Sequence, residues 1–206
     1  MTFGARWLCG FATLLLTLFI GAGEAAARSE ADIAASSSFD FGKLMAEFRK
    51  LTEATGQFTE RKYMSMLSEP LESSGTLVYF APDHLEKYTS KPQQERLIVD
   101  GDQITVDQGQ ENIRTLSVEE SPEVGGLIES IRGTLSGDAP ALERYFAIEF
   151  RGTDAAWVLT LTPKGKRMLA LVQSIHIAGS LTSIQTIETR ERNGDYSVIT
   201  ITEVGR

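Results

Sequence analysis

The sequence predicts a strongly curved antiparallel sheet or barrel of roughly ten strands, with helices lying across it. From Gln57 onward, apolar residues alternate with polar ones in short segments rich in Val, Ile, Thr, Tyr and Phe, and turn residues separate these segments at short intervals. The alternation is interrupted once, between Ser121 and Phe146, where apolar residues take helical spacing. A sheet of that size, wrapped on itself, encloses more volume than its own side chains readily fill.

A helix is predicted before the first strand. Ser37 or Ser38 can cap it, and Gly56 would end it. Its apolar residues recur at the spacing of one helical face: Phe41, Leu44, Met45, Phe48 and Leu51.

Eleven segments are then predicted to be strands, most of them linked by hairpins. They cover residues 57–65, 73–80, 85–89, 95–99, 103–107, 112–118, 146–151, 157–162, 168–177, 181–189 and 196–202. Asp100-Gly101 is a favoured hairpin dipeptide. Three later connections also have the composition of hairpin turns: Pro163-Lys164-Gly165, Ala178-Gly179-Ser180 and Asn193-Gly194.

The interruption predicts two helices. Ser121 is the expected cap and Pro122 the first helical residue, and the apolar face comprises Val124, Leu127, Ile128, Ile131 and Leu135. A short helix from 138 to 146 follows. The first helix contains Gly125, Gly126 and Gly133, each costing about 1 kcal/mol relative to alanine. Its order must therefore come from what it packs on, and it is a candidate for a movable part.

The N-terminus predicts export through a cleavable signal peptide, residues 1–27. Arg6 precedes an apolar run from Trp7 to Ile20, and small residues ending in Ala25-Ala26-Ala27 follow. The competing interpretation is a retained anchor, but the run is short for a membrane span and the polar segment 28–38, expected to be flexible, favours cleavage. Cys9 would be removed, so the mature chain would have no thiol and no disulfide.

The remaining length favours one domain, residues 39–206. The net charge of −8 is spread along the chain without a cluster of Lys and Arg. Nucleic acid is therefore not an expected partner, because binding to phosphate backbones needs such a cluster. The same acidity disfavours standing attachment to an anionic membrane.

No catalytic group stands out. His84 and His176 have no metal-type spacing to another ligand, so no metal is expected. Asp83-His84 follows Pro82 and is typical of a turn, while His176 alternates with apolar neighbours and is expected at the surface on the opposite side of the sheet. No pair of carboxylates and no phosphate loop is selected by spacing. We expect no enzyme activity and no cofactor; a hydrolase would need His84 buried beside a serine and a carboxylate.

Five motifs follow one another along the chain: Gly56-Gln57-Phe58-Thr59-Glu60, Ser74-Gly75-Thr76-Leu77-Val78-Tyr79, Ala81-Pro82-Asp83-His84-Leu85, Val99-Asp100-Gly101-Asp102-Gln103-Ile104 and Trp157-Val158-Leu159-Thr160-Leu161-Thr162-Pro163. In this order they resemble the LolA family of periplasmic lipoprotein carriers. The resemblance runs from about residue 39 to 204 and implies a mainly β fold, an incomplete antiparallel barrel of ten or eleven strands covered by about three helices. It also implies a hydrophobic pocket for acyl chains.

The resemblance implies a carrier that shields a lipoprotein or other lipid cargo and moves it from an inner-membrane donor to an outer-membrane acceptor. Such a carrier would be periplasmic, close to membranes only transiently, and is expected to be a monomer. Where the family has an arginine that holds the helical lid closed, this chain has Ala81, and Leu85 and Lys87 also depart from the family pattern. These departures leave open a different cargo, such as a glycolipid or another acyl product.

Strand alternation and the helix faces predict the pocket residues. They are Leu77, Tyr79, Leu85, Lys87, Ile104, Val106, Leu127, Ile128, Ile131, Leu135, Trp157, Leu159 and Leu161. Any one of them could instead be ordinary core. Lys87 could pair with an anionic head group or be a solvated lysine on an edge strand. The alternative function is a lipid-sensing regulatory module, which would be expected to carry a second domain.

Overall fold

A computed structural model describes residues 39–109, 112–118 and 122–203; the predicted signal peptide and the segment 28–38 lie outside them. Within this part of the chain the strands are β1 (Glu53–Tyr63), β2 (Leu71–Phe80), β3 (His84–Lys91), β4 (Glu95–Asp100), β5 (Gln103–Asp107), β6 (Ile113–Ser117), β7 (Phe146–Gly152), β8 (Trp157–Pro163), β9 (Val172–Ser180), β10 (Ser183–Glu191) and β11 (Tyr196–Glu203).

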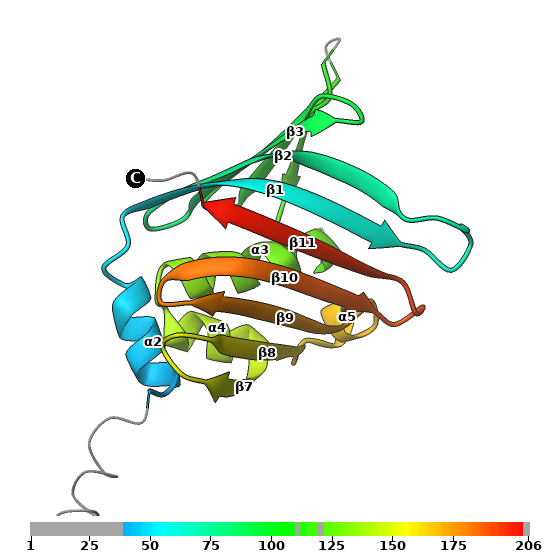
Figure 1. The fold of residues 1–206 in the computed structure, drawn as a ribbon. Helices are drawn as coiled ribbons and strands as arrows, with labels where there is room; N and C mark the ends of the chain where they lie inside the picture. The colour runs from blue at the N-terminus through cyan, green and yellow to red at the C-terminus, as the bar shows by residue number, and fades with distance from the viewer. Residues whose placement is uncertain (1–38, 110–111, 119–121, 204–206) are drawn as a thin grey trace, which may run out of the picture. The chain divides into compact units, whose positions relative to one another are not determined.

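These strands form one antiparallel sheet in the order β6-β5-β4-β3-β2-β1-β11-β10-β9-β8-β7 (Figure 1). Each strand pairs with its neighbour in the chain, except that β1 pairs with β11 and the chain crosses by helices from β6 to β7. The strands β6 and β7 are therefore the two edges of an open sheet. The predicted fold class, a mainly β incomplete barrel, is confirmed.

Four helices are present in the described residues, one more than expected. They are α2 (Phe41–Phe48), α3 (Pro122–Leu135), α4 (Ala139–Tyr145) and α5 (Lys166–Leu169). The helices α3 and α4 lie on one side of the sheet, behind β8 to β10 in Figure 1. No helix among residues 39–109, 112–118 and 122–203 is long and apolar enough to cross a membrane.

The opening helix differs from its prediction at both ends. Its N-cap is Asp40, whose carboxylate accepts a hydrogen bond from the Lys43 amide at 2.9 Å. The two predicted caps, Ser37 and Ser38, lie outside the described residues. The helix ends at Phe48, well before Gly56, because β1 already begins at Glu53 and Gly56 pairs there with Leu77 of β2.

The segment before β9 was predicted as strand from residue 168, but it begins with α5. Pro163-Lys164-Gly165 therefore leads into a helix and does not close a hairpin. Gly179 is not a turn residue either, because β9 continues through it and the chain turns at Leu181, whose φ is 51°. A Cβ at Gly179 would lie 2.1 Å from the Ser183 carbonyl oxygen and 2.6 Å from the Trp157 ring. Glycine is needed there for close packing. The hairpins at Gly101 and Gly194 are as predicted, with φ of 55° and 92°.

The buried side chains form two clusters. The larger one joins α2 and α4 to the inner face of β7 to β11 and of β1 and β2, with Phe48 and Leu142 fully buried against the sheet residues. The smaller one contains Val99, Ile104 and Val118 at the β4–β5 hairpin together with Ile128 of α3. Because α3 contributes Leu135 to the larger cluster, this helix bridges the two. A space remains between α3 and the middle of the sheet.

Candidate functional site

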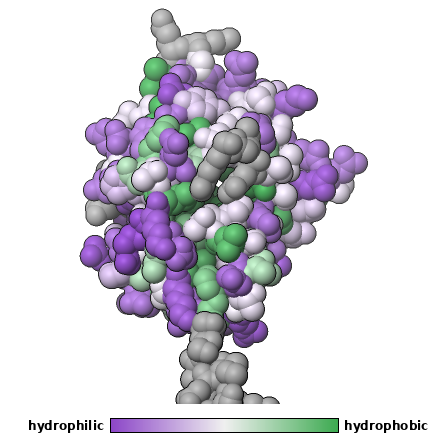
Figure 2. Space-filling model, turned by 60° about the vertical axis from the view of Figure 1, so that its left-hand side comes forward, coloured by the Kyte–Doolittle hydropathy of each residue, from purple (hydrophilic) through white to green (hydrophobic). Residues whose placement is uncertain are grey.

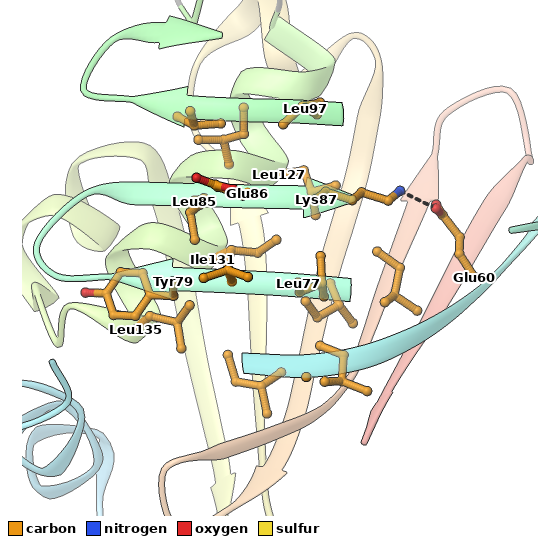
Figure 3. A pocket seen from close by; sticks show the side chains of 18 of the residues that line it. Glu60, Leu77, Tyr79, Leu85, Glu86, Lys87, Leu97, Leu127, Ile131 and Leu135 are labelled. Atoms are coloured by element: carbon orange, nitrogen blue, oxygen red, sulfur yellow. Dashed lines mark hydrogen bonds and ion pairs between the residues drawn. The ribbon is translucent and has the colours of Figure 1, made fainter. Parts of the chain in front are cut away.

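A cavity of about 350 Å³ lies between α3 and the inner face of the sheet. Its walls come from β1, β2, β3, β4, β9, β10 and β11, and from one face of α3 (Figure 3). The helix contributes four apolar side chains: Leu127, Ile128, Ile131 and Leu135. The volume falls in the range of about 300 to 1,000 Å³ that is typical of small-molecule pockets.

Strand alternation determines which side chains reach the cavity. On β1, the inward residues Ala54, Gly56, Glu60 and Lys62 line it, two residues apart except where Phe58 is buried in the core. On β11, Ser197, Ile199 and Ile201 do the same. Figure 2 shows apolar side chains, in green, exposed in a band on one face of the molecule between hydrophilic ones.

The wall changes character along the strands. Its larger part is apolar, formed by residues such as Leu77, Leu85 and Ile187. The other end is charged. There the Lys87 ammonium lies 2.6 Å from the Glu60 carboxylate, which Figure 3 marks with a dashed line, and the Lys62 ammonium lies 3.1 Å from Glu191. The cavity is therefore amphipathic, with its polar groups gathered at one end.

The structure brings together eight of the thirteen residues predicted for the pocket. These are Leu77, Tyr79, Leu85, Lys87, Leu127, Ile128, Ile131 and Leu135. Tyr79 is buried, and its hydroxyl donates to the Pro82 carbonyl oxygen at 3.3 Å. Desolvation, with a smaller contribution from the nearby Asp83 carboxylate, raises the pKa of this phenol above its ordinary value.

The other five predicted residues do not line the cavity. Trp157, Leu159 and Leu161 point to the expected face of β8, but α2 and its neighbours cover that face, and the three side chains are packed in the larger core cluster. Ile104 is fully buried in the smaller cluster, with Val106 packed against it. The strand alternation is right at these positions, but it does not show which part of the inner face is covered by a helix.

Lys87 is not a solvated lysine on an edge strand, which was one of its two interpretations. Its pairing with an anionic head group stays a prediction. Lys87 lies on β3, an internal strand, and only 26% of its side chain is exposed. Its ammonium group pairs with Glu60 and lies 4.9 Å from the centre of the Phe58 ring. The residues that sequence reasoning missed are mostly on β1, β10 and β11, including Glu60, Lys62 and Glu191. The same alternation would have identified those of β1.

The helix α3 is tied to the β4–β5 hairpin by Arg132. This guanidinium donates to the Gly101 carbonyl oxygen at 2.7 Å, pairs with Glu129 one helical turn earlier and lies 4.0 Å from Asp102. Ala81, which stands where the LolA resemblance implies an arginine, has no side-chain donor and cannot make such a hydrogen bond. In this chain the arginine that holds the helix against the sheet is on the helix itself.

Glu129, the partner of Arg132, makes the stability of the protein depend on pH. The carboxyl is buried, and desolvation raises its pKa above the ordinary value, while the adjacent Arg132 opposes part of the rise. A carboxyl whose pKa is raised by folding binds more protons in the folded than in the unfolded state. The free energy of unfolding therefore falls as pH rises from the pKa of the unfolded state to that of the folded state. We expect the free energy of unfolding, relative to that of Glu129→Gln, to decrease as pH rises above about 4.5, the ordinary pKa of a glutamate. Urea denaturation at several pH values measures this, and parallel curves for the two proteins would contradict it.

The two histidines make no catalytic arrangement with the described residues around them. The His84 ring bonds to Glu86 at 2.8 Å on the face of β3 opposite Lys87. His176 is half-buried on the outer face of β9, as the alternation predicted for its side of the sheet, and its two ring nitrogens bond to the hydroxyls of Thr160 and Ser174. No nitrogen is left there for an orienting carboxylate. The described residues contain no group of three His, Cys, Asp or Glu that could hold a metal ion.

Comparison with solved structures finds similar folds at very low sequence identity. A LolA superfamily protein from Nitrosomonas europaea is 9% identical, with a TM-score of 0.47 over 82% of this chain and 95% of that one. A putative outer membrane lipoprotein-sorting protein domain from Vibrio parahaemolyticus is 7% identical, with a TM-score of 0.43 over 78% and 87%. A DUF1329 family protein from Desulfovibrio piger is 12% identical, with a TM-score of 0.41 over 79% and 89%. A search of curated protein sequences found no match.

The family described as outer membrane lipoprotein carrier protein LolA-like matches residues 33–203, more than four fifths of the chain. This match agrees with the order of motifs in the sequence and with the open sheet crossed by helices. The chain therefore belongs to the LolA-like family of outer membrane lipoprotein carrier proteins.

Proposed function

We propose that this protein is a periplasmic carrier that shields the acyl chain of a lipoprotein or related lipid in the cavity and transfers it towards the outer membrane. The observation that carries the proposal is the cavity of about 350 Å³, most of whose wall is apolar, between α3 and the sheet. A soluble carrier needs such a cavity because acyl chains left in water are unfavourable.

The energetics suit reversible binding. Each methylene removed from water contributes about 0.8 kcal/mol, so a segment of about eight methylenes gains roughly 6 kcal/mol. Part of that gain is offset by the loss of motional freedom on binding. Binding of this strength holds the cargo in water but allows its release to a membrane or an acceptor protein. No covalent step and no cofactor is required.

Release would proceed by movement of α3. This helix is held by side-chain contacts and not by strand pairing: Leu135 and Ile128 pack on the two core clusters, and Arg132 bonds to the β4–β5 hairpin. Gly126 and Gly133 allow it to lie close to Met168 and Leu142, because a Cβ at either glycine would come within 2.8 Å of those side chains. A helix attached in this way can separate from the sheet without breaking the sheet.

A transfer assay tests this proposal. Donor vesicles carry a fluorescent diacylated lipopeptide, acceptor vesicles carry a quencher, and the purified mature protein is added in increasing amounts. We expect the transfer rate to rise in proportion to protein concentration, and native mass spectrometry of protein purified without detergent to detect an acylated species. A mass without bound lipid, together with no acceleration of transfer, would overturn the proposal.

A further inference from the structure

Four charged side chains form a row across the cavity wall at its charged end. Glu191 on β10 and Lys62 on β1 make one ion pair, and Glu60 on β1 and Lys87 on β3 make the other. Lys62 and Glu60 are two residues apart on the same strand, so they lie on the same face about 7 Å apart. All four residues line the cavity. The signs alternate along the row.

The row is electrically balanced, and it is only partly exposed to solvent. The side chains of Lys87 and Glu60 are 26% and 18% exposed, and those of Lys62 and Glu191 are 40% and 26% exposed. Glu60 also accepts a hydrogen bond from the Ser73 hydroxyl at 3.3 Å. Glu86 borders the cavity too, but its carboxylate is bonded to His84 and Tyr88 on the opposite face of β3. The cavity therefore presents two ammonium groups and two carboxylates.

These pairs are not explained well by stability alone. Exposed ion pairs contribute about 0 to 1 kcal/mol to folding stability, and partly buried pairs also lose hydration on folding. Apolar residues at these four positions would therefore stabilise the fold at least as well. The placement is also specific. The Lys87 side chain crosses the inner face of the sheet over the Phe58 ring to reach Glu60. Gly75 lies next to the Phe58 ring, and the neighbouring strand leaves no room there for a Cβ.

The balance of charge selects among head groups. An anionic head group that pairs with Lys87 displaces Glu60 and leaves that carboxylate without a cationic partner. A cationic head group that pairs with Glu60 likewise leaves Lys87 without an anionic partner. Leaving one member of a partly buried pair unpaired is costly. A head group that carries both charges can pair its anionic group with the lysine and its cationic group with the glutamate of one ion pair. No charge is then left without a partner.

We infer that the charged end of the cavity recognises a zwitterionic head group, with its acyl chain along the apolar end. This inference rests on the proposed binding of acyl chains and specifies the class of amphiphile. The anionic group of the ligand faces Lys87 or Lys62, and its cationic group faces Glu60 or Glu191.

Four single-chain probes of equal chain length test the inference: lysophosphatidylcholine, lysophosphatidylglycerol, an alkyltrimethylammonium and a monoacylglycerol, each below its micelle concentration. Their affinities are measured by displacement of a fluorescent acyl probe. We expect the zwitterionic probe to bind roughly tenfold more tightly than either singly charged probe. Lys87→Gln should then raise the affinity for the cationic probe relative to the anionic one, and Glu60→Gln should do the reverse.

The matched control is Arg61→Gln. Arg61 belongs to the same strand and pairs with Glu72 at 2.9 Å, but both side chains are more than 60% exposed and they lie on the outer face, so no preference should change. A second variant that combines Lys87→Gln with Glu60→Gln keeps only the Lys62–Glu191 pair, so it should discriminate among the four probes less strongly than the unaltered protein. Equal affinities of the unaltered protein for all probes would overturn the head-group inference while leaving the carrier proposal standing. Failure to bind any probe would overturn the carrier proposal itself.

Discussion

Replacement of Ile131 by glutamate is expected to weaken the binding of a single-chain acyl probe about a hundredfold or more, which corresponds to roughly 2.7 kcal/mol. Ile131 lies on the cavity face of α3, opposite Leu77 and Leu85 of the sheet (Figure 3). A carboxylate at this position would lose its hydration when an acyl chain occupies the cavity, and desolvation of an ion costs several kcal/mol. Fluorescence titration with the probe measures the effect.

The matched control is Val158→Glu. Val158 lies on β8 between the buried Trp157 and Leu159, and its own side chain is 40% exposed on the outer face. The same change of charge there should leave the affinity within about twofold. A milder variant, Ile131→Gln, covers the possibility of misfolding, and it should weaken binding by about tenfold with a native circular dichroism spectrum. Unchanged affinity in a folded Ile131→Glu protein would show that the acyl chain does not lie in this cavity.

The sheet could be predicted from sequence because its determinants are local. Alternation with a period of two follows the inward and outward faces of the strands, and Asp100-Gly101 specifies its hairpin by backbone conformation alone. The errors arose where a residue serves a distant contact. Gly179 is of a residue type that is common in turns. It lies within a strand, however, where glycine is needed because the Trp157 ring of the neighbouring strand packs against it. Gly56 was likewise predicted to end a helix, although it lies within β1 and pairs with Leu77 of β2.

The cavity could be predicted only in part, for a related reason. Alternation shows that Leu77 and Leu159 both point inward, but it does not show that α2 and α4 cover the inner face at β8 while the face at β2 remains open to the space under α3. That difference depends on how the helices pack after the chain crosses from one edge of the sheet to the other. Such long-range placement is not encoded in any single segment.

The ion pairs at the charged end could not be predicted because the partners in each pair are far apart in the chain. Lys87 was recognised as a cavity residue from its alternation with Leu85, but its partner Glu60 is on a different strand, two strands away in the sheet. Glu191 and Lys62 are separated by most of the chain. Many carboxylates were available as partners in the sequence, and only the register of β1 against β2 and β11 selects these.

Replacement of Trp157 by alanine is expected to lower the free energy of unfolding by about 3 to 5 kcal/mol. The indole is 1% exposed, its ring meets Phe48 of α2 edge-on at 5.7 Å between centroids, and its Nε1 donates to the Leu181 carbonyl oxygen at 2.9 Å. Alanine would leave a cavity between α2 and the sheet and remove the hydrogen bond from the indole to the β9–β10 turn. Urea denaturation followed by circular dichroism measures the loss.

Trp157→Phe separates packing from hydrogen bonding, because phenylalanine keeps most of the ring contact with Phe48 but donates no hydrogen bond to Leu181. We expect it to be intermediate in stability. Because Trp157 lies in the core cluster and not on the cavity wall, folded Trp157→Phe protein should bind an acyl probe with unchanged affinity. A large loss of affinity in this variant at full secondary structure would instead place the indole at the ligand, as the sequence first suggested, and would require the acyl chain to extend beneath α2.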